Sequence, residues 1–252
     1  MRANSKFSIA CVVVALGTVS GAALSADLTI LTNQGATPGV KELAAGFAKK
    51  SGHRVTVVQS EGKDLDRRVA EGTADLITGN PGPIEDLAKS GKVVSNTVTP
   101  FVMAGLGLSV RKGLPKPNIS TVDAYKAALL NAKSIGYSRG CSGQNTAAGI
   151  AELGLTEQLK NKTTLTTEGP VTDYLARGAF DVGIQQTNIM VGVPGSDYVG
   201  PLPGNLNKPC GSNVGVLTSS KQGEAAREMI RYMTSPEAGP LLRKTHAEPV
   251  NR

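Results

Sequence analysis

The sequence predicts an α/β protein in which parallel-rich sheets are covered by helices. Short runs of aliphatic and β-branched residues alternate with segments whose apolar residues recur every three or four positions. Small polar loops and glycines separate the two kinds of segment. The chain of 252 residues is long enough for one large domain or for two lobes of roughly 100 residues each.

The first 26 residues have the layout of a secretory signal peptide. Arg2 and Lys6 give a positive start, residues 7–16 are nearly all apolar, and small residues follow up to Ala26. We expect cleavage after Ala26, with Ala23 as the alternative site, and therefore a periplasmic protein. No later apolar run in the sequence is long enough to cross a bilayer.

The first part of the remaining chain alternates three strands with three helices. One helix is expected to start at Thr37, because Pro38 is tolerated in a first turn, and Val40, Leu43 and Phe47 then share one face. The expected strands are 28–31, 54–58 and 74–77, and the other helices carry Leu65 with Val69 and Ile84 with Leu87.

Residues 101–110 are continuously apolar or small, and we expect them to pass between two substructures. Beyond the linker-like residues 115–117 the alternation restarts. There we expect helices at 124–130, 146–153 and 171–177, strands at 134–137, 163–167 and 182–185, a turn-rich stretch at 200–205, a strand at 212–217, and closing helices at 225–233 and 236–244.

Composition argues against several classes of function. The net charge of +7 is spread along the chain and aromatic residues make up only 4%, so we expect no nucleic-acid partner. The sequence contains no zinc-spaced Cys/His cluster, EF-hand loop or Walker motif, so we expect neither a metal nor a cofactor.

Enzymatic activity is not expected either. The stretch from Gly140 to Gly143 would need glycine rather than Gln144 to form a G-x-S-x-G nucleophile turn. The two histidines, His53 and His246, lie far from it in the sequence. A secreted hydrolase that uses Cys141 or Ser142 is the alternative from another class.

Four small polar loops precede expected helices and are the candidate ligand-binding elements. In open α/β sheets ligands bind where strands lead into helices, and helix starts offer unpaired N–H groups to an anion. Arg139 is the cation of these loops, and Ser138 lies beside it. As an alternative, Ser60 and Ser142 are simply helix caps. The loops are 32–36, 59–62, 137–143 and 168–171.

Two cysteines, Cys141 and Cys210, remain after the signal peptide. An even count in an oxidising compartment allows a disulfide if the fold brings the two loops together, which spacing alone does not decide.

Several long stretches give the chain a family resemblance, which extends from about residue 28 to residue 249. The chain resembles the molybdate-binding-protein-like branch of the type 2 periplasmic solute-binding proteins, the substrate-binding components of ABC transporters. The stretches that carry this resemblance are 93–121, 133–138, 178–186 and 193–203.

The resemblance implies a two-lobed type 2 binding-protein fold. Each lobe would be a mixed, parallel-rich sheet flanked by helices, and a two-segment hinge would join the lobes. Lobe one would take residues 27–101 and 211–252, and lobe two residues 102–210. A small anionic solute would be captured between them by hinge closure and passed to a membrane permease. We expect a monomer, and a ligand-sensing partner of a membrane receptor is the second alternative.

The resemblance also implies ligand-binding positions. Lobe one would supply Asn33 or Gln34 and Ser60, and lobe two would supply Ser142 with its neighbour Gly143, then Val171 and Gln186. A carboxylate at Glu61 disfavours a tetrahedral dianion next to Ser60. The expected solute is therefore a small anion, either an oxyanion or a compact carboxylate or sulfonate that engages Arg139.

Overall fold

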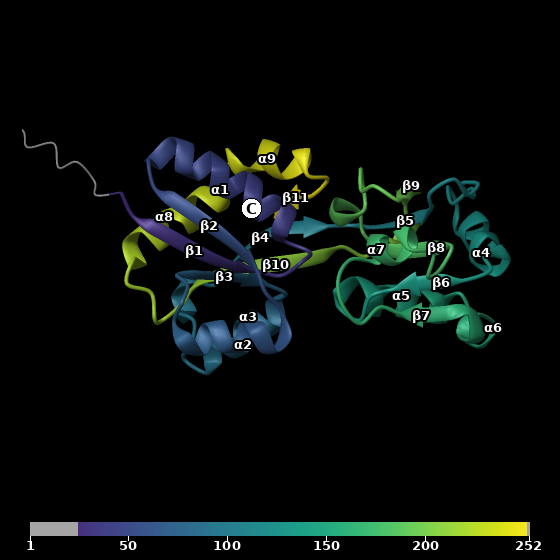
Figure 1. The fold of residues 1–252 in the computed structure, drawn as a ribbon, viewed down its shortest axis with the longest axis horizontal. Coiled ribbons are helices and arrows are strands. Elements are labelled where there is room, and N and C mark those ends of the chain that lie inside the picture. The colour runs from purple at the N-terminus through teal and green to yellow at the C-terminus, as the bar shows by residue number, and fades with distance from the viewer. Residues whose placement is uncertain (1–24, 251–252) are drawn as a thin grey trace, which may run out of the picture.

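The computed structural model describes residues 25–250. The chain forms two lobes side by side, each built on its own sheet, as expected (Figure 1). Nearly all of the expected signal peptide lies outside the described residues. Within residues 25–250, no helix is both long enough and apolar enough to cross a membrane.

The first lobe holds a six-stranded sheet in the order β11-β4-β10-β3-β1-β2. β1 pairs in parallel with β2 and β3, whereas β10 runs antiparallel to β3 and β4. The elements of this lobe are β1 (Asp27–Thr32), α1 (Thr37–Ser51), β2 (Arg54–Gln59), α2 (Gly62–Glu71), β3 (Leu76–Gly79), α3 (Pro81–Lys89), a 3-10 turn (Ser95–Thr97), β4 (Thr99–Ala104), β10 (Cys210–Val216), α8 (Gly223–Met233), α9 (Ala238–Lys244) and β11 (Glu248–Pro249).

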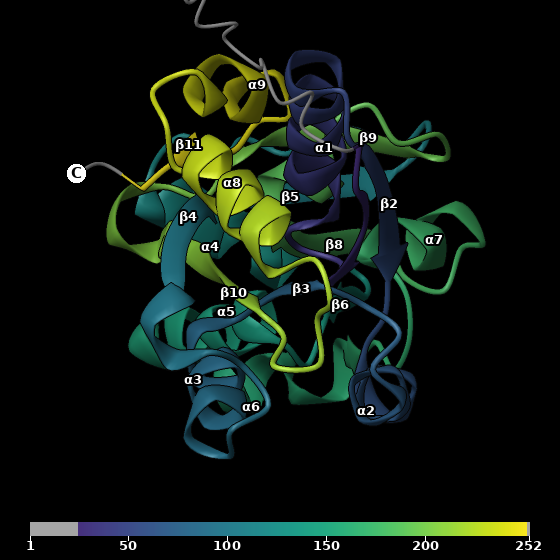
Figure 2. The ribbon, with the colours of Figure 1, turned by 90° about the vertical axis from the view of Figure 1, so that its left-hand side faces the viewer.

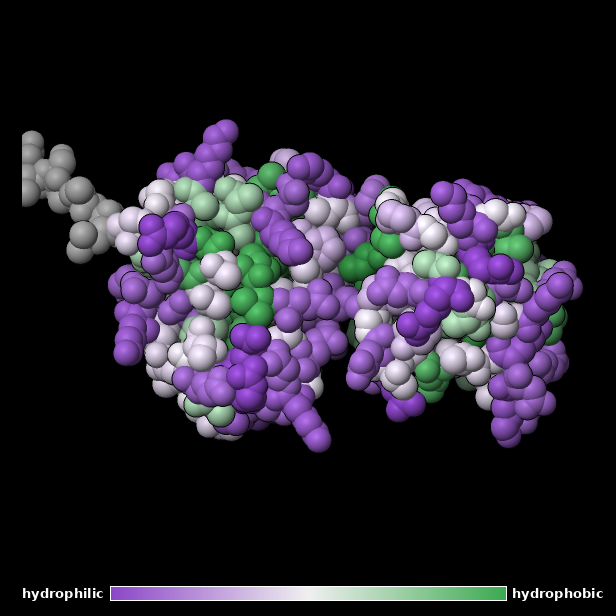
Figure 3. All heavy atoms as spheres, viewed as in Figure 1, coloured by the Kyte–Doolittle hydropathy of each residue, from purple (hydrophilic) through white to green (hydrophobic). Residues whose placement is uncertain are grey.

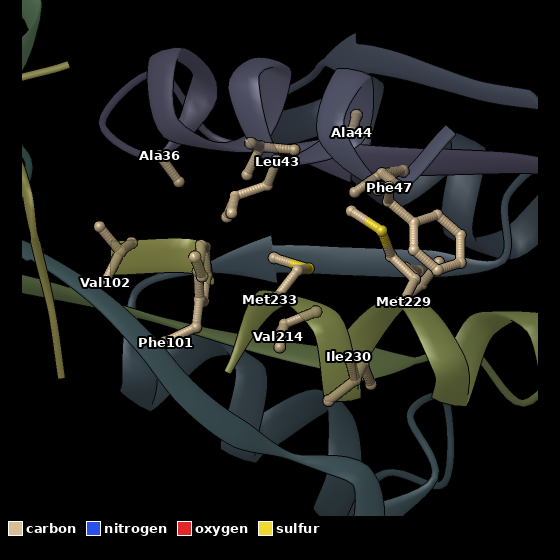
Figure 4. Packing of buried hydrophobic residues seen from close by; sticks show 14 of the residues in the cluster. Ala36, Leu43, Ala44, Phe47, Phe101, Val102, Val214, Met229, Ile230 and Met233 are labelled. Carbon is tan, nitrogen blue, oxygen red and sulfur yellow. The ribbon is translucent and has the colours of Figure 1, made fainter. Parts of the chain in front are cut away.

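Helices cover both faces of this sheet (Figure 2). On one face α1 packs against α8 and α9, and Figure 4 shows Leu43 and Phe47 of α1 opposite Met229 and Met233 of α8. α2 and α3 cover the other face around Ile77. Burial of these apolar side chains on both faces stabilises the lobe and fixes the ends of β1 and β3.

The second lobe holds a five-stranded sheet in the order β7-β6-β8-β5-β9. β6 pairs in parallel with β7 and β8, and β5 runs antiparallel to β8 and β9. Its elements are β5 (Leu106–Arg111), α4 (Val122–Asn131), β6 (Ile135–Tyr137), α5 (Cys141–Glu152), α6 (Thr156–Leu159), β7 (Thr163–Leu165), α7 (Val171–Ala176), β8 (Val182–Gln186) and β9 (Ser196–Pro201), with 3-10 turns at Lys160–Lys162, Thr187–Ile189 and Gly204–Leu206.

Two segments cross between the lobes. The apolar stretch 101–110 is divided at Gly105 into β4, which joins the first sheet, and β5, which joins the second. The return crossing precedes β10, and there Asn207 Oδ1 accepts a hydrogen bond from Leu106 N at 2.6 Å. A side chain at Gly105 would come within 2.5 Å of Asn207 Oδ1, so this close approach of the crossings requires glycine.

The lobe boundary that we expected between residues 101 and 102 falls within β4, which stays in the first sheet up to Ala104. We therefore propose Gly105 and Asn207 as the points where the chain changes lobes.

Four elements differ from the sequence-based expectation: α6 and β11 were not expected, and α5 and β9 differ in their extent or type. α5 begins at Cys141 rather than at 146, because small residues let its first turn lie directly against the preceding loop. β9 occupies part of the stretch that we expected to be a turn. It is an edge strand with Gly200 and Pro201 at its end, and Gly and Pro at such a position do not prevent pairing along one side.

Candidate functional site

A cavity of about 400 Å³ lies between the two lobes. Figure 3 shows the lobes as separate rounded masses with a hollow between them. The polar lining of the cavity comes mainly from loops at the carboxyl ends of β1, β2, β3, β6 and β7 and from the end of β8, the side of an α/β sheet where ligands bind. The cavity is therefore the candidate ligand site.

The structure brings together six of the nine residues that we expected to bind ligand. Ser60, Gly143 and Val171 do not line the cavity, although each is next to residues that do or bonded to them. The six that line it are Asn33, Gln34, Ser138, Arg139, Ser142 and Gln186.

Most main-chain amides of the loop after β1 are already hydrogen-bonded within the protein. Gln34 N donates to Glu61 Oε1 at 2.6 Å. Asn33 turns back on the loop, where its Oδ1 accepts from Ala36 N at 3.1 Å and its carbonyl accepts from Thr37 N at 3.1 Å. The Asn33 side chain thus shapes the entry into α1, a common role for asparagine before a helix.

Ser60 is buried and bonds to a residue of α2 instead of lining the cavity. Its hydroxyl donates to Asp64 Oδ2 at 2.6 Å. Asp64 also accepts from Arg67 and Arg68, and these hydrogen bonds, that of Ser60 first, hold the pKa of the Asp64 carboxyl well below its usual range. Glu61 occupies the N-cap position of α2, so Ser60 is not the helix cap of the alternative interpretation.

Gln185 is a buried residue of the site that the sequence analysis missed. Its Oε1 accepts from Val171 N at 2.8 Å, and its Nε2 donates to Gln34 Oε1 at 2.9 Å. One side chain therefore bonds the first amide of α7 and reaches across to the first lobe. The period of two along β8 could have indicated it, because Gln185 shares a face with Gly183, over which α7 packs.

A second contact between the lobes lies beside the first. Asn188 Nδ2 donates to Gly35 O at 2.7 Å. Together with the Gln185–Gln34 bond, it links the loop after β1 to the end of β8.

The start of α5 is the part of the cavity best suited to an anion. The first three N–H groups of a helix have no partner inside the helix, and the N-cap residue here, Gly140, has no side chain to bond them. Ser142 is buried in this first turn, with its Oγ 3.1 Å from Ser138 Oγ. It is therefore not a helix cap either. Arg139 is exposed at the cavity edge and adds a positive charge.

Gly143 lets the loop before α5 fold back onto the helix. A side chain at this position would lie 1.6 Å from the carbonyl oxygen of Ser138. Gly143 therefore shapes the first turn of α5, although it does not line the cavity.

Cys141, the first residue of α5, forms a disulfide with Cys210, the first residue of β10, at an Sγ–Sγ distance of 2.07 Å. The fold thus brings the two cysteine-containing loops together, a point that the sequence alone did not decide. The bond ties the start of α5 to the segment that returns the chain to the first lobe.

The loop after β7 forms another part of the lining. Thr167 N and Glu168 N both donate to the Tyr174 hydroxyl at 3.4 Å. Hydrogen bonds from the Thr167 hydroxyl and from these amides lower the pKa of Tyr174 to about 8, and the Arg177 guanidinium lies 3.7 Å over its ring. Tyr174 thus holds Glu168 at the cavity edge.

The lining also contains neutral polar residues, Thr78, Asn80 and Thr166, together with acidic and apolar ones. The acidic residues are Glu61 from the first lobe and Glu168 from the second. The apolar wall belongs to the first lobe and consists of Leu65, Ile77, Pro83, Ile84 and Leu87. Within residues 25–250, no group of three or more His, Cys, Asp or Glu residues is arranged to hold a metal ion.

A cavity between two α/β lobes that are joined by two crossing segments defines a two-lobed ligand-binding protein. The chain belongs to the family of bacterial extracellular solute-binding proteins, whose model matches residues 28–247. This family consists mainly of binding proteins without enzymatic activity.

Individual relatives differ in their ligands. The chain is 27% identical over 230 residues to an aconitate isomerase of a Pseudomonas species, covering 88% of each protein. It is 24% identical over 255 residues to the molybdate-binding protein ModA of Azotobacter vinelandii, covering 94% of this chain and 96% of that protein. The solved periplasmic molybdate-binding protein of Azotobacter vinelandii superposes with a TM-score of 0.71 at 18% identity, covering 89% of this chain and 99% of that one, and supports the fold.

Proposed function

We propose that this protein captures a small organic anion, a carboxylate or sulfonate, between its lobes and passes it to the permease of an ABC-type importer in the periplasm. The observation that carries the proposal is the cavity between the lobes, with the start of α5 and Arg139 at its second-lobe end. Main-chain amides at a helix start and a guanidinium are both suited to a carboxylate or sulfonate.

The size and lining of the cavity favour an organic solute over a tetrahedral oxyanion. A cavity of about 400 Å³ lies within the range of small-molecule sites, about 300–1,000 Å³. The apolar wall around Leu65, Ile84 and Leu87 suits a hydrocarbon portion, which an oxyanion lacks.

A thermal-shift screen of the purified protein tests this proposal. A ligand at ~100 times its Kd adds about 2.7 kcal/mol of stability. At about 2–4 °C per kcal/mol, that raises the unfolding midpoint by roughly 5–10 °C. We expect small carboxylates or sulfonates to do this and molybdate, tungstate and sulfate to do so less or not at all.

Arg139→Ala and Arg231→Ala form a matched pair for the same screen. Both remove one exposed positive charge, but Arg231 lies on α8, away from the cavity. We expect the ligand-induced shift to fall sharply in the Arg139 variant only. Equal shifts in both variants would contradict a role for Arg139 in holding the anion.

A second candidate function is isomerisation of a polycarboxylate. The relative named aconitate isomerase favours this function. The side chains of Glu61 and Glu168 favour it as well. Either carboxylate could take a proton from one carbon of the substrate and return it to another carbon as the double bond shifts. Incubation with trans-aconitate, followed by proton NMR, tests this function. Turnover that disappears in Glu61→Gln or Glu168→Gln would favour the isomerase over the binding protein.

The hydrolase alternative has no support in the geometry. Cys141 is in a disulfide, and the Ser142 hydroxyl lies against Ser138. Among the residues that the structure describes, neither His53 nor His246 lines the cavity. A sensing partner of a membrane receptor would use the same cavity and differ only in what recognises the ligand-bound form.

A further inference from the structure

The first-lobe end of the cavity carries a negative charge from one of the protein's own side chains. The Glu61 carboxylate lines the cavity, and its Oε1 accepts the Gln34 N–H at 2.6 Å. This main-chain donor is therefore not available to a ligand. In the part of the chain that the structure describes, no hydrogen bond reaches Glu61 Oε2, which can accept one from a ligand.

The second lobe also has one amide closed off. Val171 N is bonded to the buried Gln185 side chain at 2.8 Å. On the second lobe, the amides at the start of α5 and the Arg139 guanidinium remain for an anionic group. On the first lobe, the start of α2 at Gly62 also has no side-chain cap, but it lies directly beside the Glu61 carboxylate, which disfavours a second anion there. A bound anion is therefore oriented, with its charge toward α5 and the rest of the molecule toward Glu61.

Resting on the proposed function, we propose that Glu61 is a specificity-determining residue that restricts the cavity to organic molecules with a single carboxylate or sulfonate. The far end of the ligand would carry a hydrogen-bond donor, a hydroxyl or an ammonium group, directed at the Glu61 carboxylate. The site would exclude polycarboxylates and tetrahedral dianions.

Charge supplies the physical reason. Glu61 and Glu168 place two carboxylates against the single guanidinium of Arg139, so the lining is acidic before any ligand enters. A second carboxylate on the ligand would face Glu61 with nothing to neutralise it, whereas a donor there would gain a charge-assisted hydrogen bond. We expect this difference to change affinity by tenfold or more.

Calorimetry with four probes of matched length tests the proposal. Butyrate, 4-hydroxybutyrate, 4-aminobutyrate and succinate share a carboxylate and differ only at the far end. We expect wild-type protein to bind the hydroxy and amino acids at least tenfold more tightly than succinate, with butyrate between them. Glu61→Gln should reduce this ratio at least fivefold by improving the binding of succinate.

Two further variants separate charge from structure. Glu85→Gln removes the same charge from the exposed face of α3, outside the cavity, and should keep the wild-type ratio. Glu61→Ala removes the acceptor as well as the charge, so it should improve succinate binding and also abolish the preference for the hydroxyl over the methyl end. Each variant is first checked for an unchanged unfolding midpoint without ligand.

The outcomes separate this inference from the proposed function. Wild-type protein that binds succinate, trans-aconitate or molybdate more tightly than the monocarboxylates, or an unchanged ratio in Glu61→Gln, overturns the role of Glu61 and leaves anion capture in place. If folded wild-type protein binds none of these six compounds, the proposed function itself is overturned.

Discussion

The first lobe meets the cavity with a bonded loop amide, a helix start beside a carboxylate and an apolar wall, whereas the second lobe meets it with a helix start that has no carboxylate at its N-cap and with a guanidinium. Both surfaces come from the same local pattern, a strand followed by a small polar loop and a helix. The difference arises from side chains that lie outside the pattern. Glu61 bonds an amide of one loop and occupies the N-cap position of α2, and Gln185 bonds the first amide of α7. The start of α5 differs from both, because no side chain caps it and its N-cap residue is a glycine.

The largest expected effect comes from breaking the bond between α5 and the crossing segment. Cys141 and Cys210 are 69 residues apart, and in the chain-entropy model their disulfide contributes roughly 4 kcal/mol to the free energy of unfolding. The double variant Cys141→Ser, Cys210→Ser should lose most of this stability in denaturant unfolding. It should also weaken anion binding, because the start of α5 loses its tie to the crossing segment. Equal stability of the two proteins would contradict this expectation.

Gly143→Ala should damage the second-lobe surface alone. The new methyl group would meet the Ser138 carbonyl, and we expect a loss of about 1–3 kcal/mol in stability and at least tenfold in anion affinity. Gly223→Ala, at the start of α8 and outside the cavity, is the control, since a side chain there meets no atom within 4 Å. A Gly143 variant that binds as tightly as the Gly223 variant would count against the role of this turn.

Gln185→Ala should weaken the link between the two surfaces. It leaves the buried Val171 N–H without a partner, at a cost of about 1–3 kcal/mol, and removes the bond to Gln34. Gln186→Ala, at the half-buried neighbouring position, should cost about 0.5 kcal/mol or less. Urea unfolding of the two variants measures the difference. Equal losses would mean that the Gln185 bonds add little to stability.

Tyr174 gives the smallest expected effect, which depends on pH. The pKa of its hydroxyl is about 8 in the folded protein, below the ordinary value of about 10, so ionisation favours the folded state. This contribution is complete above pH 10 and is lost as the pH falls through about 8. Between pH 8 and 10, Tyr174→Phe should therefore lose stability relative to wild type, as followed by the unfolding midpoint.

Absorbance of tyrosinate provides the control for Tyr174. Wild-type protein should show one tyrosine that titrates near pH 8, and the variant should lack this step. A wild-type titration without it would contradict the bonding of the loop after β7 to the Tyr174 hydroxyl.

Much of the fold follows from periodicity along the chain. Val40, Leu43 and Phe47 face the core at helical spacing, as predicted, and the apolar run 101–110 does pass from one sheet to the other. The start of α5 was misplaced because Ser142 and Gly143 do not favour a helix on their own. β9 was missed because an edge strand with glycine and proline at its end has a turn-like sequence.

The sequence by itself determined the α/β class and the loops that meet at the cavity, because burial of apolar residues sets these patterns locally, whereas the two lobes were implied by the family resemblance. Only the tertiary structure decided which of those loops still offer donors to a ligand. Glu61 and Gln34 are 27 residues apart, and Gln185 and Gln34 are 151 residues apart. Hydrogen bonds between such distant residues depend on how the sheets and lobes pack, and no local pattern in the chain encodes them.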